Sequence, residues 1–319
     1  MTSKRSVTLL SAELLSQLPA LGADFRQAQP FRHVVIEPFF EPAVAERLLD
    51  QFPAFERGDA RSENGTLGGK SCYPMIAGLG GIYRELDRNI QSPEFLAQLS
   101  QLTGIEELRY DPDYFGGGTH ENRRGQELDP HVDFNRHPGY GWYRRLNLII
   151  YLNNEWSPEW GGGLQLHRDP RSPQDEIITV EPRFNRAILF ETHDHSWHGF
   201  PLIRTPDERP ELSRKSIALY FYTEQPPGSH RGPDHSTIYV DRPLPSYFQP
   251  GRQLDEADCA ELARHIARRD QHLQRIYGDV ARVTTELNEA RQALAASRVE
   301  RLARIVHRGL RRLGWTARS

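Results

Sequence analysis

A series of short apolar segments, separated by turns rich in glycine and proline, constrains the fold of this chain most. Six segments are strand-like in composition: 131–134, 145–152, 163–167, 176–181, 186–191 and 215–223. Several short strands at such close spacing are typical of a β-sandwich or β-barrel. The middle of the chain is therefore predicted to form an all-β core.

Helical patterns precede this core. Residues 1–30 are predicted to form a short amphipathic helix and a linker. Pro42 opens a second predicted helix, and Ser92 caps a third. Residues 56–81 are rich in glycine and are predicted to be irregular. The chain is thus expected to have an α+β fold in which N-terminal helices pack on a β core.

The C-terminal part has a different pattern. Residues 226–254 are rich in proline and are predicted to wrap around the core, and residues 255–319 are predicted to be helical. Apolar residues follow 3/4 spacing from Leu273 to Leu294, which indicates a coiled coil or a docking helix. The stretch Arg298–Arg318 is basic and could contact an acidic partner or a membrane surface. The C-terminal helix is therefore predicted to serve self-association or contact with a partner or membrane surface. The alternative is that it packs on the β core.

Composition excludes some classes of protein. The net charge of −3 does not suit a general binder of polyanions, so no nucleic-acid partner is expected. Cys72 and Cys259 are far apart and suggest no disulfide framework, so a reducing cytoplasmic location is expected. No apolar run approaches the roughly 18 residues of a membrane span.

The chain contains residues that could form a metal centre. His131 and Asp133 are two residues apart, so their side chains lie on the same face of a strand. His198, on a later strand, would complete a set of two imidazoles and one carboxylate. Such a set leaves half of an octahedron open and is typical of non-haem Fe(II) oxygenases.

Other polar residues compete for the same role. His167 and Asp169 repeat the His-x-Asp spacing and are interpreted as a polar strand end. His193 and His195 precede His198, and the three histidines could form a zinc cluster. His120 follows a glycine run and is either a structural loop residue or part of a substrate site.

Residues 31–225 resemble the prolyl-hydroxylase-like branch of the 2-oxoglutarate/Fe(II) oxygenases. The matching blocks are His131-Val132-Asp133, Arg145–Asn153 ("RLNLIIYLN"), Gly162–Leu166 ("GGLQL"), Ser196–Phe200 ("SWHGF") and Ser213–Thr223 ("SRKSIALYFYT"). The resemblance implies a double-stranded β-helix, or jelly roll, flanked by helices. It also implies Fe(II) as cofactor and 2-oxoglutarate and O2 as co-substrates, with ascorbate as a candidate reductant.

Carried over by position, the resemblance makes His131, Asp133 and His198 the metal-binding catalytic residues. Arg214 matches the residue that holds the distal carboxylate of 2-oxoglutarate, and Tyr151 matches a phenol that hydrogen-bonds the same group. Ser216 shares a strand face with Arg214, whereas Lys215 would face the opposite side. Asn147 lies on the face of Tyr151 and is a weaker candidate for the co-substrate site.

The predicted organisation has four parts: 1–30 helix and linker, 31–225 oxygenase domain, 226–254 wrap segment and 255–319 basic coiled-coil tail. The predicted function is a dioxygenase that hydroxylates an unactivated C–H bond and releases succinate and CO2. A peptidyl or amino-acid (prolyl-like) residue, or another small molecule, is the expected substrate. An aromatic wall of Tyr140, Trp142 and Tyr143 could contact it.

Two other functions remain open at this point. One is a cupin-type metal-dependent hydrolase or isomerase that uses His131, His193, His195 and His198. The other is a non-catalytic binding module in which the coiled coil is the functional part. The first predicts no role for Arg214, and the second predicts that no iron is retained.

Overall fold

The computed structural model describes residues 9–61, 67–228 and 233–312 of the chain. The chain divides into two compact units, Met1–Pro243 and Leu244–Ser319, and each is described by itself. The finer division into four parts stays a prediction.

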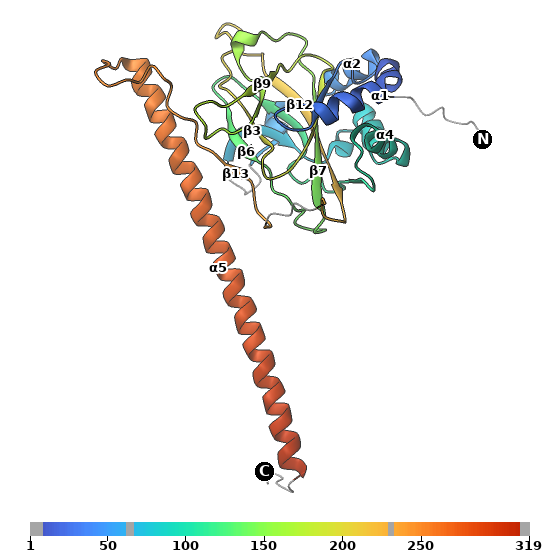
Figure 1. Ribbon diagram of the computed structural model, residues 1–319, viewed down its shortest axis with the longest axis vertical. Coiled ribbons are helices and arrows are strands. Elements are labelled where there is room, and N and C mark those ends of the chain that lie inside the picture. The colour runs from blue at the N-terminus through green and yellow to red at the C-terminus, as the bar shows by residue number, and fades with distance from the viewer. Residues whose placement is uncertain (1–8, 62–66, 229–232, 313–319) are drawn as a thin grey trace, which may run out of the picture. The chain divides into compact units, whose positions relative to one another are not determined.

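The first unit is built on two antiparallel sheets (Figure 1). The larger runs in the order β1 (His33–Ile36), β10 (Ala187–Glu191), β7 (Tyr143–Tyr151), β12 (Arg214–Thr223), β5 (Gly118–Asn122), β3 (Leu67–Tyr73) and β2 (Asp59–Arg61), with β4 (Arg109–Tyr110) also paired to β12. The smaller runs in the order β13 (Ile238–Tyr239), β6 (Leu128–Val132), β11 (Trp197–Phe200), β8 (Leu164–His167) and β9 (Ile177–Val180). This arrangement confirms the predicted jelly-roll core.

Helices cover one face of the larger sheet. They are α1 (Ala12–Gln27), α2 (Pro42–Asp50), α3 (Gly81–Ile90) and α4 (Pro93–Thr103). Short 3-10 turns lie at Phe55–Arg57, Ile76–Leu79 and Pro158–Trp160. Figure 1 shows α1, α2 and α4 on the same side of the β core. Ser11 caps α1 and Ser92 caps α4, each hydroxyl accepting a hydrogen bond from a backbone N–H of the first turn. The α4 cap is as predicted.

Alternation along β7 and β12 separates the helix-facing side of the sheet from the inner side. Leu146, Leu148 and Ile150 join the core beneath the helices, whereas Tyr151 belongs to a second apolar cluster with residues of β8. Because successive strand residues point to opposite faces, the inner face carries the side chains between those that contact the helices. The inner face is where the candidate site residues lie.

The expectation that residues 56–81 are irregular is wrong for the part that the structure describes. β3 pairs with β5, with Ser71 opposite Glu121 and Cys72 opposite His120, and β2 pairs with β3. Glycines have little intrinsic preference for strands, so the local sequence gives no strand signal here. Backbone pairing with a strand distant in sequence supplies the order instead.

The second unit contains one long helix, α5 (Glu256–Arg312). Its start is fixed by Asp255, whose carboxylate accepts from the N–H of Asp258, and by an ion pair of 2.8 Å between Arg252 and Asp258. Of the predicted basic stretch, residues 313–319, with Trp315 and Arg318, lie outside the described part. In the described residues, no helix combines the length and apolar character that a bilayer crossing requires.

Candidate metal centre

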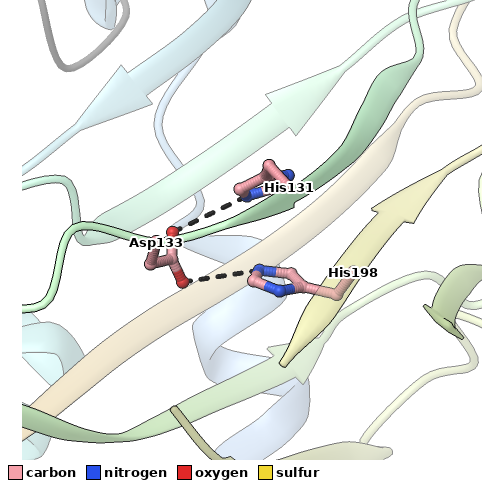
Figure 2. Close-up of side chains that lie close together, drawn as sticks. All are labelled: His131, Asp133 and His198. Atoms are coloured by element: carbon pink, nitrogen blue, oxygen red, sulfur yellow. Dashed lines mark ion pairs between the residues drawn. The ribbon is translucent and has the colours of Figure 1, made fainter. Parts of the chain in front are cut away.

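His131, Asp133 and His198 lie together in the interior between the two sheets (Figure 2). Their candidate donor atoms all lie within 4.8 Å of one another. His131 Nε2 is 3.6 Å from Asp133 Oδ1, and His198 Nε2 is 3.4 Å from Asp133 Oδ2. The structure therefore brings these three side chains together, as the sequence predicted.

Strand pairing explains why they meet. His131 of β6 and His198 of β11 are directly opposite in the antiparallel ladder, so their side chains are on the same face. Their ring centroids are 4.3 Å apart. Tyr239 of β13 stacks on the other side of His131, with a centroid distance of 5.0 Å. The smaller sheet thus supplies both imidazoles and a platform for one of them.

Each imidazole is oriented by its own strand. Nδ1 of His131 lies 2.9 Å from the carbonyl of Asp129, and Nδ1 of His198 lies 2.8 Å from the carbonyl of Ser196. If each Nδ1 donates to its carbonyl, each Nε2 keeps a lone pair for a metal. Burial and the neighbouring His131 lower the pKa of His198 to about 3, which favours the neutral ligand form.

Two inward-facing residues of β7 hold the carboxylate of Asp133. Asn147 donates from Nδ2 to Asp133 Oδ2 at 2.7 Å, and a guanidinium nitrogen of Arg144 is 3.1 Å from the same oxygen. Arg144 Nε also donates to Asn147 Oδ1 at 2.9 Å, which closes a triangle. Burial acts to raise the pKa of Asp133, but Arg144 and the two imidazoles outweigh it and hold the pKa well below its usual value.

Sequence analysis missed Arg144 because a bulge in the ladder changes which face its side chain occupies. Strict alternation would place Arg145, not Arg144, on the face of Asn147. The pairing of β7 with β12 is irregular between Leu146 and Arg144, so Arg144 turns inward. Arg145 instead forms an ion pair with Glu191 at 3.3 Å.

Arg214 lies on the inner face of β12 and is 4% exposed. Its Nε donates to the carbonyl of Gly162 at 2.7 Å, and its terminal nitrogen donates to the hydroxyl of Tyr151 at 3.2 Å. No carboxylate forms an ion pair with it in the described ranges of the chain. Burial lowers the pKa of Arg214 and raises that of Tyr151, as expected for a cation and a phenol removed from water.

The neighbours of Arg214 divide between the two faces. Ser216 is opposite both Tyr151 and His120 in the ladders, so it shares the inner face. Lys215 points the other way and forms an ion pair with Glu121 at 3.2 Å. Of the two basic residues, Arg214 is the one that faces the interior between the sheets.

His120 also faces inward and is buried at its Nε2. In the part of the chain that the structure describes, this nitrogen has no hydrogen-bond partner. Burial, with contributions from Lys70 and Arg214, holds the pKa of His120 well below its usual value, so the ring is neutral. Its assignment to a substrate site stays a prediction.

The competing residues lie elsewhere. Nδ1 of His167 is 2.7 Å from Asp175 Oδ2, and Asp169 accepts from the N–H of Arg171, a local turn contact. His193 packs its ring against Phe31. Within the described residues, the one group that could hold a metal is that of His131, Asp133 and His198.

The aromatic residues of 140–143 form a cluster with basic neighbours. Tyr140 stacks on Trp142 with centroids 4.4 Å apart, Arg109 lies over Trp142 at 5.3 Å, and Arg136 lies over Tyr143 at 4.8 Å. Tyr140 is 45% exposed. This places an aromatic surface on the loop before β7, and its role in substrate contact stays a prediction.

The donor set fits a divalent transition metal. Two imidazoles and one carboxylate are the ligands of a 2-His-1-carboxylate centre, and all three are buried and oriented by hydrogen bonds. Arg214 and Tyr151 add a cation and a hydroxyl that could hold an anion in the same interior. The arrangement can therefore bind a metal together with an anionic ligand.

Part of the chain matches the model of a known protein family. The model of the 2OG-Fe(II) oxygenase superfamily matches residues 117–222. Two curated relatives are named Prolyl 3-hydroxylase OGFOD1: one from Xenopus laevis, 31% identical over 100 residues and 30% of this chain, and one from Mus musculus, 29% identical over 109 residues and 34% of this chain. The match spans 18% and 16% of the length of these relatives.

Among solved structures, a prolyl hydroxylase from Trichoplax adhaerens in complex with a peptide fragment of the hypoxia inducible factor oxygen degradation domain is similar. The identity is 15% and the TM-score 0.48, and the match covers 67% of this chain and 94% of that chain. Residues 117–222, which match the model of the 2OG-Fe(II) oxygenase superfamily, include His131, Asp133 and His198.

Proposed function

We propose that this enzyme hydroxylates a C–H bond of a peptidyl or amino-acid residue related to proline, with 2-oxoglutarate as the co-substrate. One oxygen atom of O2 would enter the product alcohol, and the other would enter succinate as 2-oxoglutarate loses CO2. His131, Asp133 and His198 would hold the Fe(II). Arg214 and Tyr151 would hold the distal carboxylate of 2-oxoglutarate.

The single observation that carries this proposal is the environment of Arg214. A buried cation without a carboxylate partner destabilises the folded state, because no opposite charge compensates for its loss of hydration. Arg214 has a carbonyl and a phenol as hydrogen-bond partners, and both are neutral. A ligand carboxylate gripped by the guanidinium would supply the missing anion.

The residues of this chain bind and orient, and the metal supplies the oxidative chemistry. When bound, Fe(II) provides O2 activation, which no side chain can supply. Asn147 and Arg144 fix the carboxylate of Asp133, and the carbonyls of Asp129 and Ser196 fix the imidazoles. Preorganisation of this kind keeps donors in place without the cost of rearrangement during the reaction.

The proposed substrate class rests on the relatives. Both are named prolyl 3-hydroxylases, and the family model matches residues 117–222, which carry the metal centre. A cupin-type hydrolase is less well supported, because His193 lies against Phe31 and outside the metal group. A peptidyl or amino-acid residue is therefore the first substrate to test.

The test has two stages. Anaerobic addition of Fe(II) and then 2-oxoglutarate should produce a visible charge-transfer band, and air should then yield succinate. Proline-containing peptides and free amino acids should next be searched by mass spectrometry for a product heavier by one oxygen atom. A metal-dependent activity that ignores 2-oxoglutarate would instead favour the hydrolase or isomerase.

Replacing Asn147 with leucine should weaken the binding of Fe(II). The substitution removes the 2.7 Å hydrogen bond to Asp133, and loss of such an outer contact typically costs about 10- to 100-fold in metal affinity. Titration of the metal-free protein measures the change. Asn135→Ala is the matched control, because the Asn135 amide donates to the backbone of Pro233 at 2.9 Å. Equal losses in both variants would show that Asn147 does not act on the metal ligand.

A further inference from the structure

The apolar residues of α5 are exposed and form a regular stripe, for which the oxygenase function gives no reason. Its members are Ile266, Leu273, Ile276, Val280, Val283, Leu287 and Leu294, each between 47% and 61% exposed. From Leu273 to Leu287 they recur at alternating intervals of three and four residues, and Ile266 and Leu294 lie one heptad beyond each end, in a helix of 57 residues. An apolar stripe of this length exposed to water is a surface that favours a partner.

We propose that α5 joins two copies of this chain in a parallel, in-register coiled coil from Leu262 to Leu294. The heptad a positions are Cys259, Ile266, Leu273, Val280, Leu287 and Leu294, and the d positions are Leu262, Arg269, Ile276, Val283 and Ala290. At 1.5 Å per residue the seam is about 50 Å long.

The width of the stripe favours a second helix over a globular surface. A helix that packs on a domain has a wide apolar face, which includes e or g positions beside a and d. Here the e positions hold Ala263, Asp270, Tyr277, Thr284 and Arg291, and the g positions hold His265, His272, Asp279, Glu286 and Ala293. These flanks are mostly polar, so the apolar stripe is the narrow a/d seam of a coiled coil.

Charge complementarity favours two parallel copies. In a parallel coiled coil a g residue faces the e residue of the next heptad in the partner helix. Glu286 would then face Arg291 of the second copy. None of the g–e pairs in the stretch from residue 265 to residue 291 brings like charges together. An antiparallel alignment that overlaps the same apolar seam would place Asp279 opposite Asp279.

One residue of the seam limits the number of helices. Arg269 occupies a d position and is exposed in α5. A two-stranded seam leaves such a side chain room to reach water, whereas a three- or four-stranded core would bury the charge at high cost. The proposal is therefore a dimer.

Sedimentation velocity of the full chain tests the stoichiometry. The wild type should sediment as a dimer, and the double variant Leu273→Glu with Leu287→Glu should be a monomer, since four charges would meet in the seam. The double variant Gln271→Glu with Gln292→Glu adds the same charge at f positions and should remain a dimer. A monomeric wild type, a larger oligomer, or a seam variant that stays dimeric overturns the proposal. Unchanged circular dichroism in both variants shows that the helix persists.

Cys259 tests the orientation. It is an exposed a-position residue in the first turn of α5, and the other cysteine, Cys72, is partly buried. In a Cys72→Ser variant, a short bis-maleimide reagent should link two chains through Cys259 if the helices are parallel. In an antiparallel pair the two thiols would be more than about 50 Å apart and would not be linked. Efficient dimer formation without cross-linking therefore overturns the parallel arrangement. The Cys72→Ser, Cys259→Ser variant controls for other reactive groups.

Discussion

Replacing Asp133 with alanine is expected to abolish Fe(II) binding and turnover and also to destabilise the unit that carries the metal centre. The first effect follows from the loss of one of three donors. The second follows from Arg144, whose buried guanidinium loses the carboxylate 3.1 Å away. Removing one member of a buried ion pair costs about 3–5 kcal/mol, and stacking of Arg144 on Tyr220 favours the lower end.

A second substitution separates the two effects. His198→Ala should also abolish the charge-transfer band, but it removes a neutral ring and leaves the contact between Asp133 and Arg144 in place. Urea denaturation of both metal-free variants measures the difference in the free energy of unfolding. Equal stabilities would show that the ion pair contributes nothing to the fold. If His167→Ala with Asp169→Ala abolishes the band instead, the assignment of the metal ligands is wrong.

Replacing Arg214 with alanine is expected to raise the 2-oxoglutarate requirement by roughly 30-fold to several thousand-fold. The range corresponds to the loss of about 2–5 kcal/mol when one side of a buried, hydrogen-bonded charge pair is removed. Arg214→Lys should recover part of the affinity, because lysine restores the charge without the planar fork. Anaerobic titration of the charge-transfer band gives the dissociation constant directly.

Lys215→Ala provides the matched control for this measurement. Lys215 is the next residue, carries the same charge and pairs with Glu121 on the opposite face of the sheet. Its removal should leave 2-oxoglutarate binding unchanged. An unchanged affinity in Arg214→Ala, or a loss confined to Lys215→Ala, would remove the main support for the proposed co-substrate site.

Local patterns were enough to predict the central strands and the shared face of His131 and Asp133. β7 and β12 combine β-branched and aromatic residues with alternation, and both features are local. The His-x-Asp spacing places two side chains on one face of a strand, which is also a local property. Only the meeting of His131 with His198 needed a distant pairing, and the resemblance to known oxygenases supplied it.

What the sequence could not predict depends on pairing between distant segments. β3 contains two adjacent glycines, Gly68 and Gly69, and becomes a strand by pairing with β5. α3 is a different case, because Ile82, Leu86 and Ile90 have helical spacing, and this local pattern is sufficient to predict the helix. Arg144 and Arg145 look equivalent in the sequence, and the bulge in the ladder decides which one reaches Asp133.

The bulge in β7 determines how this strand responds to the deletion of one residue. Deleting one residue between Arg144 and Leu146 would remove the irregularity and restore strict alternation on β7. The shortened strand could keep every pairing of its apolar residues, and Arg144, then directly before Leu146, would still point to the inner face and reach Asp133. Deletion of Arg145 would therefore remove the ion pair with Glu191 but keep the contact between Arg144 and Asp133, whereas a one-residue deletion elsewhere in β7 would reverse the face of the residues beyond it.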